Sequence, residues 1–320
     1  AYALDLRTFF HFLLKLRYPN QEERDISALS LEDMQNLDAE DLEAFLSYIT
    51  YYEQDHDHVH QNDSRAKLRK LSALRALFNY LFKKKLLDTN VAALVDAPKV
   101  KEKPIVRLEP DEAANLLDTV ESGEQMTAHG QSYHKQTQKR DLAIITLLLG
   151  TGIRVSELVG LNIGDIQFEN SSFRVTRKGG SSVLLYFGDE VEAALKGYLQ
   201  ERRNITSYDG HEDALFLSMQ KKRISTRAVQ NLVKKYSQMA VPLKNISPHK
   251  LRSTYGTTLY QETGDIYLVA DVLGHRDINT TKKHYAAQSD SNRRRAARVV
   301  RLRNDEGGSP ELDPEGDSNE

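Results

Sequence analysis

A proline-containing stretch, 97-APKVKEKPIVR-107, does most to limit how this chain of 320 residues can fold. Its two prolines disfavour helix, because a proline pushes the residue before it out of the helical region. The sequences on either side carry their own apolar patterns, and a chain of this length is expected to form about two domains. We therefore predict a helical domain over residues 1–98, a linker over 99–107 and a second domain over 108–303.

Apolar residues before this stretch recur at helical spacing. A second helix is predicted over 39–52, because Asp38 is a good N-cap with Asp41 at the third helical position. A third helix is predicted over 64–85, with its basic residues largely off the apolar face, and a short fourth helix over 88–95. The first helix is predicted from Leu4, Leu6, Phe9, Phe10, Leu13 and Leu14.

The second domain combines helical segments with one segment of strand period. Residues 172–187, SFRVTRKGGSSVLLYF, alternate around Gly179-Gly180 and predict a β-hairpin. The polar segment 121–138 is predicted to be a loop or insertion. The predicted fold class is therefore mainly α with a small antiparallel β-sheet in the second domain. Helices are predicted from Pro110, over 140–149, 153–161, 190–203, 225–240, 248–262 and 265–273, and again around Tyr285.

Charge is distributed unevenly along the chain, although the formal net charge is only −2. Residues 304–320 hold seven acids and no base, so the rest of the chain has 44 basic and 39 acidic residues, a net charge of +5. Residues 65–85 contain eight Lys or Arg and no acid, and residues 293–303 contain six Arg and no acid. Such clusters attract phosphates, although many charge runs are only solvated helix faces. We expect the acidic tail to be disordered.

Several classes of protein are excluded by what the sequence lacks. No apolar run approaches the roughly 18 residues of a membrane-spanning helix, and the first residues do not have a signal-peptide pattern. The absence of cysteine excludes disulfides, thiolate zinc sites and cysteine nucleophiles, and it fits a reducing cytoplasm. The chain begins without methionine inside a predicted helix, so we expect native sequence to precede it.

Two segments place a basic side chain beside glycines. In 150-GTGIRVSELVGL-161, Arg154 begins a predicted helix just after a glycine turn, and glycine lets a backbone approach a ligand closely. Glu157 follows three residues later, where it could orient the arginine. Lys178 lies at the predicted hairpin tip, from which a flexible side chain can reach into a groove. Each feature alone could equally be surface charge.

Two further segments carry histidines at helix ends. The segment 247-SPHKLRSTYGTTLY-260 opens a helix, and His249 and Arg252 fall on one face of its first turns. Because a helix N-terminus favours anions, these side chains predict a phosphate site or, alternatively, an exposed helix start with incidental charges. His275 follows Gly274, which is a good C-cap for the helix that ends at residue 273.

The order of these segments is specific. An arginine, a hairpin lysine, a His-x-x-Arg pair, a Gly-His pair and a tyrosine ten residues further on resemble the motifs of the tyrosine recombinase (phage integrase) family. The resemblance covers residues 105–300, and it is closest to Xer-type and transposon integrases. One departure is Ser253, where many members have histidine or arginine. The matching residues are Arg154 in TGIRVSEL, Lys178 in TRKGG, His249 and Arg252 in PHKLR, His275 in LGH, and Tyr285.

The resemblance implies a site-specific recombinase that cleaves and rejoins DNA through a 3′-phosphotyrosine intermediate, built as a two-domain, C-shaped clamp. No cofactor or metal is needed, because two guanidinium groups supply the positive charge that a metal would bring. For the same reason we interpret 55-DHDHVHQND-63, with three histidines, as a polar loop rather than a metal site. The implied roles are nucleophile for Tyr285, phosphate clamp for Arg154 and Arg252, hydrogen-bond donor for His275, general base for His249, general acid for Lys178, and support for Glu157.

The resemblance also implies partners. The helical first domain is similar to the family's core-binding domain, so we expect its basic run to bind double-stranded DNA. We expect a homotetramer on two paired sites, in the cytoplasm. The arginine-rich residues 293–303 could contact DNA or form a C-terminal helix that packs on a neighbouring protomer, and we favour the neighbour. The expected DNA-binding residues are Arg65, Lys67, Arg69, Lys70, Arg75 and Lys282.

Other functions remain open from the sequence. A type IB topoisomerase would use the same phosphotyrosine chemistry on a single duplex, and a catalytically inactive DNA-binding protein would use only the basic surfaces. A recombinase could act in chromosome dimer resolution or in mobile-element integration and excision.

Overall fold

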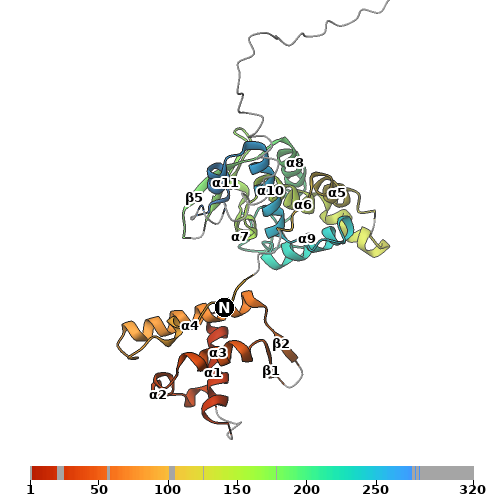
Figure 1. Cartoon of the computed structure of the whole chain (residues 1–320). Coiled ribbons are helices and arrows are strands. Elements are labelled where there is room, and N and C mark those ends of the chain that lie inside the picture. Colours follow the sequence, from red (N-terminus) through yellow and green to blue (C-terminus); the bar gives the residue numbers. More distant parts are fainter. Residues whose placement is uncertain are drawn as a thin grey trace, which may run out of the picture. The chain divides into compact units, whose positions relative to one another are not determined.

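The computed structural model describes residues 2–19, 25–55, 58–100, 105–124, 126–177, 179–275, 278 and 281, and the side chains of 52–55 and 58–61 lie outside this description. The chain divides into two compact units, Ala1–Pro104 and Ile105–Glu320 (Figure 1). No helix in the described part of the chain is both long and apolar enough to cross a membrane. The C-shaped arrangement of the two domains stays a prediction.

The first unit is a small set of helices with one β-hairpin (Figure 1). Its core is built from the apolar faces of the helices, where the rings of Phe9, Phe45 and Phe78 are wholly buried. Phe9 meets Phe45 and Phe78 edge-on, at centroid distances of 5.2 Å and 6.4 Å, an arrangement that aromatic pairs favour. The elements are α1 (Tyr2–Arg17), η1 (Ile26–Ala28), α2 (Leu31–Gln35), α3 (Ala39–Tyr48), β1 (Tyr51–Asp55), β2 (His58–Gln61), α4 (Ser64–Lys83) and η2 (Val91–Ala93), where η is a 3-10 helix.

The predicted cap of α3 is confirmed, but its predicted end is wrong. The side chain of Asp38 accepts a hydrogen bond from the backbone N of Asp41, and the Asp41 carboxylate accepts one from the backbone N of Asp38. The helix ends at Tyr48 rather than at residue 52. Residues 51–55 form a strand instead, because aromatic residues such as tyrosine fit a strand well.

Two smaller expectations for this unit also need correction, and one element was not expected. Part of the loop expected over 55–63 is strand β2, which pairs antiparallel with β1. The helix expected over 88–95 is reduced to the 3-10 helix η2. The short helix α2 was not expected, although Ser30 and Asp33 form the capping box that signals its start.

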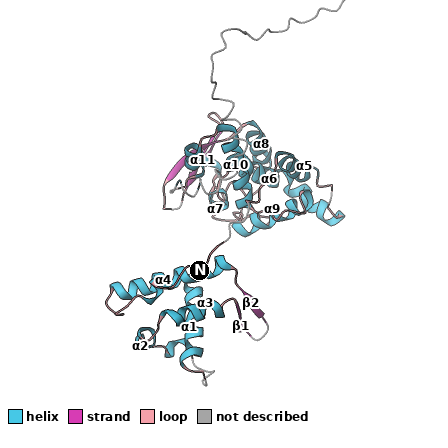
Figure 2. Cartoon of the chain, in the orientation of Figure 1, coloured by secondary structure: helices cyan, strands magenta, loops and turns pink. Residues whose placement is uncertain are grey.

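In the second unit, five helices pack around α6, namely α5, α7, α8, α9 and α10, and the unit includes a small sheet (Figure 2). The sheet is antiparallel in the order β3-β4-β5, so the predicted hairpin over 172–187 is confirmed, with Thr176 paired to Ser182 next to the turn. The predicted fold class is therefore confirmed. The elements are α5 (Pro110–Ser122), α6 (Ala128–Thr151), α7 (Val155–Gly160), η3 (Ile163–Asp165), β3 (Ile166–Gln167), β4 (Ser172–Thr176), β5 (Ser182–Tyr186), α8 (Asp189–Arg202), α9 (Thr226–Ala240), α10 (Pro248–Thr263) and α11 (Ile266–Leu273).

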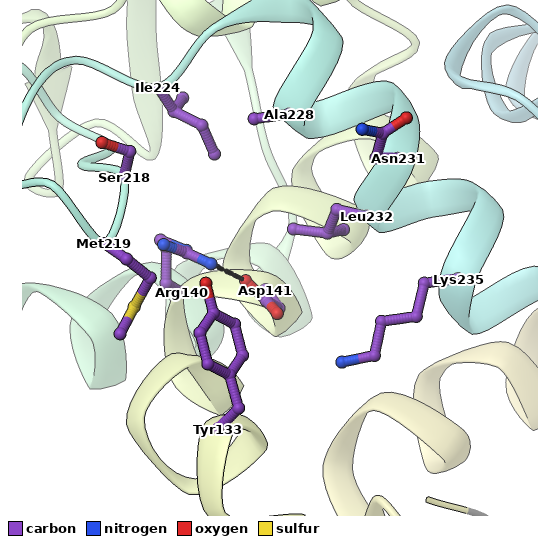
Figure 3. Close-up of a pocket in the computed structure, with 10 residues that line it drawn as sticks. All are labelled: Tyr133, Arg140, Asp141, Ser218, Met219, Ile224, Ala228, Asn231, Leu232 and Lys235. Atoms are coloured by element: carbon purple, nitrogen blue, oxygen red, sulfur yellow. Dashed lines mark hydrogen bonds and ion pairs between the residues drawn. The ribbon is translucent and has the colours of Figure 1, made fainter. Parts of the chain in front are cut away.

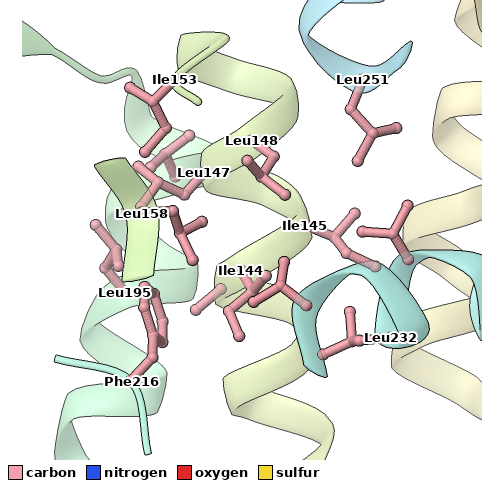
Figure 4. Packing of buried hydrophobic residues seen from close by; sticks show 14 of the residues in the cluster. Ile144, Ile145, Leu147, Leu148, Ile153, Leu158, Leu195, Phe216, Leu232 and Leu251 are labelled. Carbon is pink, nitrogen blue, oxygen red and sulfur yellow. The ribbon is translucent and has the colours of Figure 1, made fainter. Parts of the chain in front are cut away.

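Helix α6 lies at the centre of this unit, and most side chains of its C-terminal half are buried. Ile144, Ile145 and Leu148 are wholly buried against neighbouring helices (Figure 4). The prediction of a loop over 121–138 is wrong from residue 128 onwards, because α6 begins there. The side chain of Thr127 caps this start by accepting from the backbone N of residue 130.

Candidate active site

Arg154 lies at the junction between α6 and α7. Gly152 ends α6 with a left-handed backbone, φ 62°, and a Cβ at this position would come within 2.4 Å of the Tyr255 ring. The close approach and the positive φ both require glycine. The turn carries Arg154 to the N-cap position of α7, as the sequence motif predicts.

Glu157 fixes the direction of the Arg154 side chain. Its carboxylate is buried and accepts two hydrogen bonds from the same arginine, one from the backbone N and one from Nη1, each at 2.8 Å. The first turn of a helix also favours a negative side chain. The contact between Glu157 and Arg154 is therefore the one that their three-residue spacing predicts.

Arg252 lies in the first turns of α10 and is only 5% exposed. Its Nη1 donates to the carbonyl oxygen of Gly152 at 2.6 Å, and its Nη2 donates to the carbonyl oxygen of Leu273. The guanidinium thus joins α10 to the end of α6 and to the end of α11. The start of α10 is further held by Thr254, whose hydroxyl accepts from the backbone N of Leu108 at 3.0 Å.

The C-terminus of α11 brings the two arginines together. Gly274 caps this helix with φ 62°, and Arg154 Nη2 donates to its carbonyl oxygen at 3.0 Å. Arg252 donates to the adjacent carbonyl, that of Leu273. Carbonyls at the end of a helix have no partner within the helix and carry partial negative charge, so they attract guanidinium groups. Two arginines from distant parts of the sequence are thereby placed on neighbouring peptide units.

His275 follows directly and is held from two sides. Its backbone N donates to the carbonyl of Ala270 at 2.9 Å, and its Nδ1 lies 2.8 Å from the hydroxyl of Thr281, a wholly buried residue. Thr281 was not predicted, because nothing in its sequence context distinguishes it. His249 is exposed and precedes Arg252 by three residues on α10, which places both on one helix face.

Three predicted site residues, Lys178, Lys282 and Tyr285, lie outside the described residues. Two other tyrosines that were interpreted as packing residues are described. Tyr255 and Tyr260 both pack against the small apolar cluster of Val269 and Leu273. Burial raises the pKa of the Tyr255 hydroxyl, which makes its ionised form less accessible.

The predicted DNA-binding residues of α4 fall into two groups. Lys70 is buried and Arg75 half-buried, and each has protein partners: Lys70 Nζ bonds to Asp5 at 3.2 Å, and Arg75 donates to the carbonyls of Ala92 and Val95. Both side chains therefore stabilise the first unit, and their expected role as DNA contacts stays a prediction that these bonds do not favour. Arg65 and Arg69 are exposed and Lys67 is half-buried, and Arg69 also bonds to Asp5 at 2.5 Å.

A cavity of about 410 Å³ in the second unit has none of the predicted site residues in its wall (Figure 3). It lies between α6 and α9, and an ion pair of Arg140 and Asp141 at 2.7 Å forms part of the wall. Asp141 also accepts from the hydroxyl of Tyr236 at 2.9 Å. Burial and the nearby Asp141 raise the pKa of Tyr236, so it remains a neutral donor. This network joins α6 to α9 and has a structural role.

Comparison with known proteins identifies the family. A sequence model of the Phage integrase family matches residues 106–292, which is more than half of the chain. The chain belongs to the phage integrase family. It is a tyrosine recombinase, an enzyme that cleaves and rejoins DNA strands in site-specific recombination, as the motif order predicts.

Curated relatives within the phage integrase family match most of the chain. Tyrosine recombinase XerC of Caldanaerobacter subterraneus subsp. tengcongensis is 34% identical over 306 residues, which cover 92% of this chain and 79% of the relative. Tyrosine recombinase XerC of Leptospira interrogans is 28% identical over 290 residues, which cover 91% of this chain and 83% of the relative.

Solved structures of the family share the fold. The XerH site-specific recombinase bound to palindromic difH substrate gives a TM-score of 0.69 at 23% identity, covering 93% of this chain and 78% of that one. The Tn1549 transposon integrase in complex with circular intermediate DNA gives a TM-score of 0.64 at 19% identity, covering 92% of this chain and 99% of that one. The predicted likeness to both Xer-type and transposon integrases is thus confirmed.

Proposed function

We propose that Tyr285 attacks a phosphodiester at a specific double-stranded DNA site and forms a 3′-phosphotyrosine intermediate. The tyrosine oxygen bonds to phosphorus while the bond from phosphorus to the 5′ oxygen breaks. His249 accepts the tyrosine proton, and Lys178 gives a proton to the leaving 5′ oxygen. The covalent bond keeps the energy of the phosphodiester, so the strand can be rejoined without ATP.

The placement of Arg154 and Arg252 on adjacent carbonyls, immediately before His275, carries this proposal. Phosphoryl transfer depends on positioning and on donors aimed at the non-bridging oxygens. A guanidinium has five N–H groups, so it can bond to a carbonyl and to a phosphate oxygen at once. The two arginines would bind the two non-bridging oxygens, and His275 would supply a further donor.

Covalent trapping tests the nucleophile. The chain is incubated with nicked duplexes that carry a randomised segment, and SDS-resistant protein–DNA complexes are isolated and sequenced. Tyr285→Phe removes the attacking oxygen, so we expect the adduct to disappear. Tyr208→Phe is the matched control, because Tyr208 is exposed and lies outside the site, and it should trap DNA like the parent chain. An adduct that persists in Tyr285→Phe contradicts the proposal.

We propose that the first unit is the DNA-binding domain and the second the catalytic domain. The exposed face of α4 supports this assignment, because Arg65, Lys67 and Arg69 reach the surface from one helix of the first unit. Lys282, the residue after Thr281 and three residues before Tyr285 in the chain, would add a contact near the nucleophile. These side chains would bind phosphates. Contacts with the phosphate backbone fix the position of a protein on a duplex, but they carry no information about the base sequence.

Salt dependence separates the two groups of basic residues in α4. The logarithm of the binding constant should fall linearly with the logarithm of salt concentration, by about 0.9 per phosphate contact. Arg65→Ala should reduce that slope by about 1, measured by fluorescence anisotropy with a labelled duplex. Arg75→Gln should leave the slope unchanged, because Arg75 bonds to backbone carbonyls. Equal slopes for the parent chain and Arg65→Ala would remove Arg65 from the interface.

We propose that the active assembly is a cytoplasmic homotetramer on two paired sites, in which residues 293–303 pack on a neighbouring protomer. The similarity to both XerC proteins and a transposon integrase supports a role in chromosome dimer resolution or in mobile-element integration. The trapped DNA tests the paired-site assembly. A near-palindrome with a short central spacer is expected for it, and trapped DNA without a shared site would contradict it.

A further inference from the structure

Arg177, the residue before the proposed general acid, contacts the same helix end as the two phosphate-binding arginines. Its Nη2 donates to the carbonyl of Val272 at 2.9 Å, and Nη1 and Nη2 both lie 3.4 Å from the carbonyl oxygen of Asp271. Arg252 donates to the next carbonyl, that of Leu273, and Arg154 donates to the one after it, that of Gly274. Four successive carbonyls at the end of α11 are thus bound by three guanidinium groups, each from a different part of the chain.

The contact between Arg177 and the α11 end is close as well as polar. The guanidinium lies against Gly274, where a Cβ would come within 2.3 Å of Nη1. Gly274 is therefore covered by Arg177 on one side, while its carbonyl oxygen accepts from Arg154. The Arg177 guanidinium is therefore held directly against the last turn of α11.

The backbone of Arg177 is also fixed, at the base of the hairpin turn. Its N donates to the carbonyl of Ser181 at 2.8 Å, and its carbonyl accepts from the N of Gly180 at 3.0 Å. The side chain and the backbone of this one residue therefore connect β4 and its turn to the C-terminus of α11. Lys178 is the next residue in the chain.

We propose that Arg177 is a positioning residue that attaches the hairpin carrying Lys178 to the end of α11. It thereby fixes the position of the general acid, Lys178, relative to the phosphate-binding Arg154 and Arg252. This inference rests on the proposed function, in which Lys178 protonates the leaving 5′ oxygen. Lysine is a flexible point donor, so its reach depends on where the hairpin is held. An arginine fork on two carbonyls is a rigid attachment, and no other described side chain of the turn makes such a contact with α11.

Substitution of the leaving oxygen tests this role. The DNA site recovered by trapping is synthesised in two forms, one with oxygen and one with sulfur at the bridging 5′ position. A thiol has a pKa of about 8.5, so a thiolate can leave without first gaining a proton. A variant whose only defect is in the general acid should therefore react at the parent rate on the sulfur substrate. Arg177→Ala should form adduct about 10²-fold more slowly on oxygen DNA and within about 5-fold of the parent rate on sulfur DNA.

Matched variants make the result specific. Arg174→Ala removes the same charge from an exposed position of the preceding strand, β4, and it should keep the parent rate on both substrates. Arg177→Lys keeps the charge but cannot bond to two carbonyls as a fork, so its rate on oxygen DNA should be intermediate. The dissociation constant for the site should change little in every variant. The thermal midpoint of Arg177→Ala should stay close to that of the parent chain.

Two outcomes would overturn the positioning role. The first is an Arg177→Ala rate on oxygen DNA that matches the parent rate, and the second is an equal loss on both substrates. Failure of the proposed function is recognised separately, because it would appear as adduct formation by Tyr285→Phe. The comparison of oxygen with sulfur DNA would still report whether Arg177 acts on departure of the leaving group.

Discussion

Replacing Arg252 by lysine should lower the rate of covalent adduct formation by about 10²- to 10³-fold while the affinity for DNA changes little. The loss is expected because lysine keeps one positive charge but has no planar fork. Arg252 uses its two Nη atoms to bond to the carbonyls of Gly152 and Leu273. A lysine ammonium could donate to at most one of these carbonyls while it also contacts a phosphate oxygen. The transition state would therefore lose a donor that is held in a fixed position.

The same change at an exposed arginine provides the control. Arg203 lies at the end of α8, away from the site, and Arg203→Lys should keep the parent rate. Single-turnover adduct formation on the trapped site measures both rates, and filter binding measures both affinities. An Arg252→Lys rate within about 3-fold of the parent rate would show that the guanidinium fork is not required for the clamp.

Replacing Asp5 by alanine should lower the free energy of unfolding of the first unit by about 3–5 kcal/mol. Asp5 is 3% exposed, and its carboxylate bonds to Arg69 at 2.5 Å and to Lys70 at 3.2 Å. Lys70 is itself buried, so the substitution leaves an ammonium group in the interior without the carboxylate that faces it. Removing one partner of a buried ion pair is far more costly than removing both.

A double substitution separates the ion pair from the packing around it. Asp5→Leu combined with Lys70→Met fills a similar volume with apolar groups, so most of the lost stability should return. Glu43→Ala, at an exposed carboxylate of α3, should leave stability nearly unchanged. Urea unfolding followed by hydrogen exchange in α1 and α4 reports on this unit within the full chain. A loss below about 1 kcal/mol for Asp5→Ala would mean that the buried pair contributes little.

Much of the fold could be predicted from local patterns, and the failures have physical causes. The β4–β5 hairpin has both strand alternation and a Gly-Gly turn, so its position was clear. The first half of α6 has no apolar stripe, because buried polar groups such as His134 and Thr137 take those positions. His134 is buried through its bond to the hydroxyl of Tyr236 at 3.0 Å, a partner on α9 that periodicity cannot reveal.

The candidate site, like the fold, could be predicted only in part from local patterns. The identities of Arg154, Arg252 and His275 followed from the order of the motifs, and the ion pair with Glu157 followed from helical spacing. Their convergence on the carbonyls at the end of α11 is a tertiary fact that no local rule contains. Arg177 had a signal in the TRKGG motif, but an arginine beside a hairpin turn is more often a solvent-exposed charge.

The measurement that tests the central claim most directly is the location of the DNA on the trapped protein. Trypsin cleaves after Lys283 and Arg293, so Tyr285 is the only tyrosine in the peptide HYAAQSDSNR. After nuclease trimming of the adduct, mass spectrometry should find the residual nucleotide on this peptide, linked to Tyr285 through a 3′ phosphate. A nucleotide on any other peptide would contradict the assignment of Tyr285 as the nucleophile, and a link through a 5′ phosphate would contradict the 3′-phosphotyrosine intermediate.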